Sequence, residues 1–155
     1  MPPPVDAAAF VAAFARGWES PGPGVWDDLL DTNVVLRQPL LPDLIGRSAL
    51  NDEYGRLVTL IPDLHGEVLR WAATGDALLI EMRLTGTFGR RPAELTLVDR
   101  LLLDDNGRCI ARQAYFNPIP LALTLFRHPK IWLSWLQARA PRLTCPVREA
   151  PQGSR

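Results

Sequence analysis

The chain has 155 residues, of which 17 are basic and 17 acidic, so that its formal net charge at neutral pH is zero. Hydrophobic residues make up 47% of the total, which together with the length suits one domain with a substantial core. Generic nucleic-acid binders carry a basic surplus or a basic stripe. The charge balance therefore excludes that class, and we expect no nucleic-acid partner.

Thiol and imidazole groups are scarce: the chain has two cysteines, Cys109 and Cys145, and two histidines, His65 and His128. They are too few for a disulfide scaffold or a His/Cys metal cluster. A carboxylate metal site stays open, but we expect neither metal nor cofactor, because no phosphate loop or dinucleotide fingerprint is present. No signal peptide is visible and no apolar run approaches 18 residues. We therefore expect a cytoplasmic domain without membrane contact.

The first half of the chain predicts three helices and one strand. After five disordered residues, Asp6 is the predicted N-cap of a helix over residues 7–18. The apolar residues of this helix share one face: Phe10, Val11, Phe14 and Trp18. The proline- and glycine-rich run 20–24 ends it. The elements that follow are a short helix over 25–30, a strand over 34–38, and a helix capped by Ser48 that Pro62 closes.

Beyond Pro62 the hydrophobic period changes to two, which is typical of strands. The predicted strands are 67–73, 77–88, 94–104 and 108–117. Asn106-Gly107 favours a hairpin between the last two, because Asn and Gly tolerate positive φ. Helices followed by an antiparallel meander predict an α+β fold.

The character of the sequence changes after Pro118. Ile131, Trp132, Trp135 and Leu136 recur at helical spacing. We expect a domain over residues 6–118, a helical extension over 119–140 and a disordered tail over 141–155. The extension suits a lid, a dimer arm or an interfacial helix, and its short, proline-broken apolar stretches favour packing on the domain.

Asp99 is an acidic residue on a face of the predicted strand 94–104 that is otherwise apolar. Alternate residues of a strand share a face, which places Asp99 among leucines: Leu95, Leu97, Leu101 and Leu103. A carboxylate on an apolar face is costly unless it is paired or protonated. We therefore single out Asp99 as the most informative residue of the sequence.

The hairpin supplies Asp99 with a partner. A two-residue loop sets Asp99 opposite Ala114 with Arg112 one diagonal away, whereas a four-residue loop sets Arg112 directly opposite. Either loop places Ile110 and Arg112 on the leucine face, and a three-residue loop breaks this parity. An Asp99–Arg112 pair that only fixes the sheet register stays open as the structural alternative.

The order of elements and four local stretches resemble the SnoaL-like group of the nuclear transport factor 2 superfamily, which includes ketosteroid isomerase, limonene epoxide hydrolase and polyketide cyclases. The stretches are Phe10-Val11-Ala12-Ala13-Phe14, Leu36-Arg37-Gln38-Pro39, Val98-Asp99-Arg100, and Gly107-Arg108 leading to Ala114-Tyr115-Phe116-Asn117. The resemblance covers about Asp6 to Pro118. It implies a cone-shaped, curved antiparallel sheet wrapped on the three helices around an apolar cavity, to which this chain adds its C-terminal helical segment.

The resemblance carries over few catalytic residues. Gln38 stands where the isomerase has its aspartate base, and Phe10 stands where it has an oxyanion-binding tyrosine. Asp99 matches its second hydrogen-bond donor, a protonated aspartate, although Arg112 nearby favours the charged form of Asp99. Ala114 stands where the epoxide hydrolase and the cyclases have an acid. Steroid isomerisation by the family mechanism is therefore disfavoured.

Two functions stay open. As an enzyme, the protein isomerises, cyclises or hydrates a small hydrophobic molecule, with Asp99 as general acid or base, Arg112 tuning it and Gln38 orienting substrate or water. As a non-catalytic binding or dimeric accessory domain, it keeps the apolar pocket while Asp99–Arg112 is structural. The ligand-contacting residues are in both cases Phe10, Phe14, Trp18, Tyr54, Met82, Leu84 and Phe116.

The convex face of the sheet is the expected homodimer interface, since dimerisation there is common in the family that the chain resembles. We place Trp71, Tyr115 and Cys109 on this face. Both cysteines lack an activating base and are expected to be inert.

Overall fold

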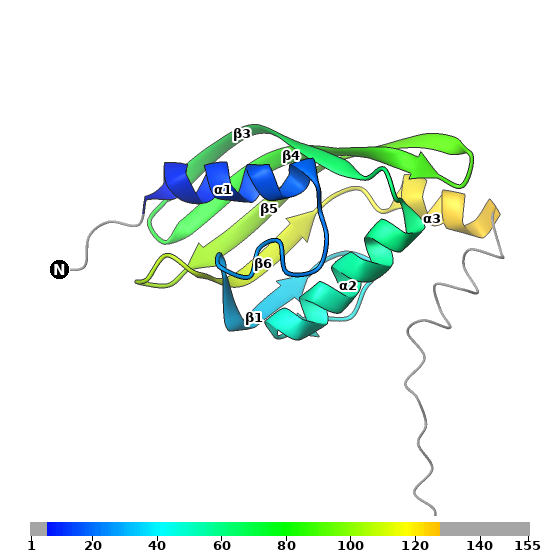
Figure 1. Cartoon of the computed structure of the whole chain (residues 1–155). Helices are drawn as coiled ribbons and strands as arrows, with labels where there is room; N and C mark the ends of the chain where they lie inside the picture. Colours follow the sequence, from blue (N-terminus) through cyan, green and yellow to red (C-terminus); the bar gives the residue numbers. More distant parts are fainter. Residues whose placement is uncertain (1–5, 128–155) are drawn as a thin grey trace, which may run out of the picture. The chain divides into compact units, whose positions relative to one another are not determined.

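The structure is a computed structural model that describes residues 6–127. Its elements, shown in Figure 1, are α1 (Ala7–Glu19), β1 (Leu30–Arg37), β2 (Leu44–Ile45), α2 (Arg47–Leu60), β3 (His65–Thr74), β4 (Ala77–Phe88), β5 (Arg91–Leu103), β6 (Cys109–Tyr115) and α3 (Ile119–Arg127). The chain divides into two compact units, the first ending at Pro118 and the second beginning at Ile119. The expected terminal tails and the tryptophan-containing part of the extension lie outside the described residues.

The first unit is built on a curved, open sheet of six strands in the order β2-β1-β6-β5-β4-β3. Neighbouring strands are antiparallel except β1 and β6, which pair in parallel. Helix α1 packs on β3, and α2 packs on β1. The α+β fold expected from the sequence is confirmed. No helix in the described part of the chain is long and apolar enough to cross a membrane.

The ends of the helices follow local chemistry. The Asp6 carboxylate accepts a hydrogen bond of 2.9 Å from the amide of Ala9, which confirms Asp6 as the N-cap of α1. The predicted cap of α2 is wrong, because Gly46 is the N-cap and Ser48 already lies in the first turn. Gly46 has φ +91°, a backbone conformation that glycine adopts without steric cost.

The helix expected over 25–30 is also wrong, because turns occupy residues 23–29. The amides of Leu29 and Leu30 bond to the Trp26 carbonyl at 2.9 and 3.1 Å, but β1 begins at Leu30 and stops any helix. The Cys109 amide donates to the Leu29 carbonyl at 2.8 Å. Pairing with β6 therefore extends β1 back over residues that a helix would need.

The β5–β6 hairpin confirms the register of a two-residue loop, with Asp99 opposite Ala114 and Leu101 opposite Arg112. Its tip nevertheless closes differently, because the Asp104 amide donates to the Arg108 carbonyl at 2.8 Å. The register shifts between Leu102 and Leu103, where a β-bulge restores the parity that the longer loop would break.

This bulge reverses two predicted side-chain directions at the start of β6. Cys109 is fully buried in the core, not on the convex face, whereas Ile110 is exposed, not on the leucine face. A second register shift, between Val68 and Arg70, affects β3. Trp71 pairs with the fully buried Ile80, so that the register places it on the inner side of the sheet and not on the convex face.

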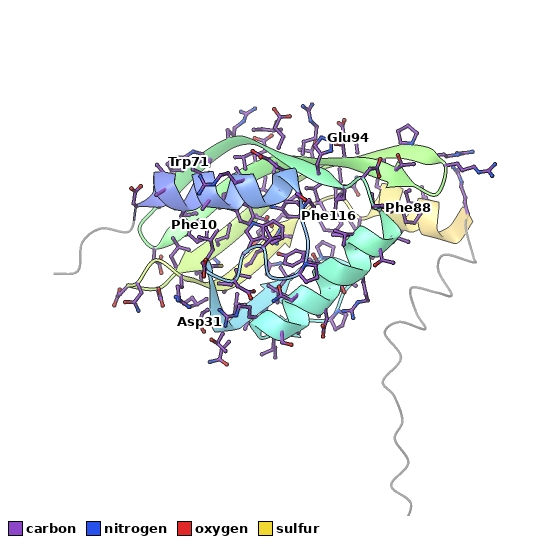
Figure 2. The ribbon with its side chains drawn as sticks, in the orientation of Figure 1. Phe10, Asp31, Trp71, Phe88, Glu94 and Phe116 are labelled. Carbon is purple, nitrogen blue, oxygen red and sulfur yellow. The ribbon has the colours of Figure 1, made fainter. Side chains whose placement is uncertain are left out.

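The core lies between the inner face of the sheet and the two helices. In Figure 2, Phe10 lies below α1, whereas Glu94 lies at the periphery. The largest fully buried side chains are Trp18, Trp26, Phe14, Leu50, Ile80, Met82, Leu101, Val34, Asp99 and Cys109. A single carboxylate among these apolar groups marks the part of the core that needs a chemical explanation.

Candidate active site

Asp99 occupies the middle of β5, between Ala114 on β6 and Ile80 on β4. Its neighbours along the same face, Leu97 and Leu101, are buried. Asp99 itself is 0% exposed, as the leucine row predicts. Burial of a carboxylate removes its hydration, so that nearby protein groups have to stabilise the charge.

Arg112 provides that stabilisation. It lies diagonally across the hairpin on β6, is 6% exposed, and its Nη2 donates to Asp99 Oδ2 at 2.7 Å. Its Nη1 donates to the hydroxyl oxygen of Tyr54 on α2 at 2.6 Å. The ion pair that the sequence predicts is present, and Tyr54 extends it from the sheet to a helix.

Aromatic rings surround the guanidinium. Arg112 Cζ lies 5.6 Å from the ring centroid of Phe14 and 5.8 Å from that of Trp18, within the range of cation–π attraction. Gly66 on β3 permits the close approach of Trp18, since an added Cβ would meet the Cβ and Cδ2 atoms of Trp18 at 3.1 Å. The apolar stripe of α1 is therefore the wall that faces Arg112.

Trp26 belongs to this aromatic cluster and is not among the residues predicted from the sequence. Its ring centroid lies 4.9 Å from that of Trp18 and 4.6 Å from that of Tyr54, and its Nε1 donates to the Phe14 carbonyl at 3.1 Å. A tryptophan directly after a proline- and glycine-rich turn was the available signal, since a solvated loop has no need of one.

Burial dominates the protonation equilibria of the site. It raises the pKa of Asp99, and the charge and hydrogen bond of Arg112 offset only part of that rise, contrary to the expectation that Arg112 decides the balance. Burial lowers the pKa of Arg112, but the attractions to Asp99 and Tyr54 together with the hydrogen bond to Asp99 outweigh it, so that the pKa is raised overall and the guanidinium stays charged. Burial also raises the pKa of Tyr54, and that of Cys109 to about 12.

Three buried polar atoms around the pair have no hydrogen-bond partner among the described residues: Asp99 Oδ1, Arg112 Nε and Trp18 Nε1. Native interiors leave few such atoms, and each calls for an explanation. One oxygen of Asp99 is therefore fixed by Arg112, while the other is free to accept or donate a proton.

The remaining predicted site residues are near the core but not all near Asp99. Phe10 stacks on Phe14 with centroids 6.4 Å apart, and Met82 is fully buried. Leu84 and Phe116 are half-buried against the same core. Gln38 is half-buried just beyond the end of β1, and no hydrogen bond within residues 6–127 joins it to Asp99.

Metal chemistry has no visible site in the part of the chain that the structure describes, because no three His, Cys, Asp or Glu side chains gather there. The chemical resources of the centre are the carboxyl group of Asp99, the guanidinium of Arg112, the phenol of Tyr54, the surrounding aromatic rings and the Cys109 thiol, which its raised pKa keeps protonated. This set can exchange a proton and stabilise an anionic oxygen next to apolar surface.

The family model of the SnoaL-like domain matches residues 9–111. The chain belongs to the SnoaL-like domain family. The matched range contains Phe14, Trp18, Tyr54 and Asp99, and it ends one residue before Arg112. No curated protein matches the chain.

Solved structures show the same fold at low sequence identity. A protein of ketosteroid isomerase-like fold from Catenulispora acidiphila, solved in complex with trimethylamine, is 18% identical with a TM-score of 0.64, over 70% of this chain and 85% of that one. A candidate SnoaL-like polyketide cyclase from Jannaschia is 18% identical with a TM-score of 0.65, over 79% of this chain and 92% of that one. An LEH-like epoxide hydrolase from M. tuberculosis is 18% identical with a TM-score of 0.62, over 81% of this chain and 93% of that one.

Within this SnoaL-like domain the position opposite Asp99 is Ala114, which is buried and cannot exchange a proton. The acid that the resemblance places in the last strand is therefore absent from that position, and Arg112, two residues earlier on the same strand, supplies the polar group instead. At the centre of the sheet, the described residues therefore pair the acid Asp99 with the buried cation Arg112.

Proposed function

We propose that this SnoaL-like domain binds a small, largely apolar molecule and isomerises, cyclises or hydrates it, the last reaction taking an epoxide as substrate. Asp99 is the general acid or base. The observation that carries the proposal is the divided role of its carboxyl group: Arg112 holds Oδ2 at 2.7 Å, and Oδ1 has no hydrogen-bond partner among the described residues. A raised pKa suits a carboxyl group that has to hold a proton and release it.

The other residues have supporting roles in this proposal. Arg112 keeps Asp99 in place and stabilises an anionic oxygen as charge develops on the substrate. Gln38 orients the substrate or a water molecule. The apolar part of the substrate contacts the aromatic and aliphatic side chains already described: Phe10, Phe14, Trp18, Tyr54, Met82, Leu84 and Phe116.

The test is a turnover assay with the purified protein. A panel of terpene and styrene epoxides, β,γ-unsaturated ketones and linear polyketide mimics is incubated with the wild type, Asp99→Asn and Asp105→Asn. Asp105 is an exposed residue of the hairpin tip and serves as the matched control. We expect turnover of at least one class, a loss of about 100-fold or more in Asp99→Asn, and no change in Asp105→Asn.

An equal rate in Asp99→Asn, with the fold intact by circular dichroism, would refute the catalytic role of Asp99. The alternative function is a non-catalytic binding or accessory domain, and one observation favours it. Phe10, Phe14, Trp18 and Tyr54 are all buried in one continuous core cluster together with Trp26. If the panel gives saturable quenching of tryptophan fluorescence but no turnover in the wild type, this alternative replaces the enzyme.

We further propose that the domain forms a homodimer through the outer face of the sheet. Val98 and Tyr115 pair across β5 and β6 with exposures of 36% and 53%, and Leu79 on β4 is also exposed. Neighbouring apolar side chains on one face of a sheet are typical of an interaction surface. Sedimentation of the wild type as a dimer and of Tyr115→Glu as a monomer supports this interface, whereas a monomeric wild type contradicts it.

A further inference from the structure

The connection between α1 and β1, residues 20–29, lacks regular secondary structure and runs between α1 and α2 (Figure 1). We call this segment the strap. Its internal hydrogen bonds are those of single turns, such as Asp27 amide to Gly24 carbonyl at 3.2 Å. Segments held only by turns and a few side-chain bonds open at lower free energy than the strands of a core sheet.

Trp26 is the part of the strap that reaches the site. It is buried, and its ring packs on Tyr54 and Trp18, both of which contact Arg112. Its neighbours Gly24 and Val25 are exposed. Within the strap, Trp26 is therefore the residue that connects the exposed turn at Gly24 and Val25 to the rings around the ion pair.

Two glycines, Gly17 on α1 and Gly55 on α2, allow the strap to pack closely against these helices. A Cβ added at Gly17 on α1 would lie 2.2 Å from Trp26 Nε1, and one added at Gly55 on α2 would lie 3.3 Å from Pro23 Cγ. Both helices therefore lack a side chain where the strap lies against them. Trp26 packs closely against α1 because Gly17 has no side chain, and a Cβ at that position would occupy the space of the indole ring.

Polar side chains on α2 fasten the strap from outside. Asn51 accepts from the Gly24 amide at 3.0 Å and donates to Asp27 Oδ1 at 2.9 Å. Arg47 donates to the Asp27 carbonyl at 2.9 Å. These bonds are exposed or half-buried, so that water can replace them when the strap moves and the net cost of breaking each one is small.

We propose that the strap is the gate of the site, with Trp26 as its plug and Asn51 as its latch. Asp99 is 0% exposed and is enclosed by hydrogen-bonded strands on both sides, so that ligand entry requires one part of the wall to open. Residues 20–28 of the strap can open without breaking a hydrogen bond of the sheet or of a helix, although this opening breaks the buried hydrogen bond from Trp26 Nε1 to the Phe14 carbonyl. This inference rests on the proposed function only in assuming that a ligand enters.

Hydrogen exchange followed by NMR tests the gate without any substrate. Three groups of protons are compared in the full chain: the indole N–H of Trp26, the indole N–H of Trp18 behind it, and the β5 amides from Leu97 to Leu101. We expect both indoles to exchange at one common rate that is faster than that of the β5 amides and nearly independent of low urea concentrations. Such behaviour indicates local opening.

Asn51→Ala removes two hydrogen bonds of the latch and should raise exchange of both indoles about 30-fold while leaving the β5 amides unchanged. Asp52→Ala, an exposed residue on the same helix, is the matched control and should change neither. The proposal is overturned if the indoles exchange with the β5 amides and with the same urea dependence, or if Asn51→Ala accelerates all three groups equally. Failure of the turnover assay leaves this result unaffected, so the two proposals fail separately.

Discussion

Replacing Arg112 by methionine tests whether the Asp99–Arg112 pair governs the stability of the core. The variant keeps the aliphatic volume between Phe14 and Trp18 but removes both charge-assisted contacts, at 2.7 Å to Asp99 and 2.6 Å to Tyr54. Asp99 then becomes a buried carboxylate without a partner. Removal of one member of a buried pair costs about 3–5 kcal/mol, and we expect a loss of this size in the free energy of unfolding at neutral pH.

The loss should shrink on acidification. Burial already raises the pKa of Asp99 in the folded state, and Arg112 is the group that lowers it, so the pKa rises further in Arg112→Met. A group whose folded pKa lies above its unfolded value contributes stability that is complete below the unfolded pKa and disappears as the pH rises through the folded pKa. The variant therefore regains stability as the pH falls from neutral through the raised pKa of Asp99.

Urea unfolding followed by tryptophan fluorescence measures these changes. Arg100→Met, an exposed arginine on the same strand as Asp99, is the matched control and should stay within about 0.5 kcal/mol of the wild type. The double variant Asp99→Leu/Arg112→Met should be more stable than Arg112→Met alone, because no unpaired charge remains. If Arg112→Met lowers the free energy of unfolding by less than about 1 kcal/mol at neutral pH, the ion pair does not govern the stability of the core. The same conclusion follows if the double variant is no more stable than Arg112→Met.

Three further predictions concern neighbouring contacts. Tyr54→Phe leaves Arg112 Nη1 without its acceptor and should lower the free energy of unfolding in urea by about 1–3 kcal/mol. Tyr115→Phe, at an exposed tyrosine, is the control. An equal loss in both variants would show that the Tyr54–Arg112 hydrogen bond does not contribute to stability. Gly66→Ala brings a Cβ to 2.8 Å from Leu84 Cδ2 and 3.1 Å from Trp18, and should cost about 1–3 kcal/mol, whereas Gly22→Ala, with nothing within 4 Å, should cost less. Hydrogen bonds from Thr87 lower the pKa of Asp63, so this carboxylate stabilises the fold above its unfolded pKa and stops doing so as the pH falls through the folded value. Asp63→Asn should consequently unfold with a weaker dependence on acid than the wild type, and an unchanged pH profile would rule this out.

The strand register of the site was accessible from the sequence because it depends on local periodicity. Alternation in β5 placed Asp99 among leucines, and turn chemistry left two registers open, one with Arg112 diagonal to Asp99 and one with Arg112 directly opposite. The pairing of Leu101 with Arg112 and the contact of 2.7 Å confirm the buried position of Asp99 and the diagonal register. Side-chain directions nearer the turn were wrong for Cys109 and Ile110, since a one-residue bulge reverses parity without leaving a clear signal in the sequence.

Contacts between distant segments were beyond any local pattern. The hydroxyl of Tyr54 on α2 accepts a hydrogen bond from Arg112 on β6, 58 residues away. Trp26 packs against α1 at Gly17, where the absence of a side chain leaves room for the indole ring. The balance of burial against charge at Asp99 likewise depends on which side chains surround it in three dimensions. The sequence by itself determined α1, α2, the strands β3 to β6, the buried acid and its cation, because periodicity and turn residues act locally. Tertiary structure alone decided the phenol on that cation, the covering tryptophan and the raised pKa of Asp99, because packing and desolvation depend on all neighbours at once.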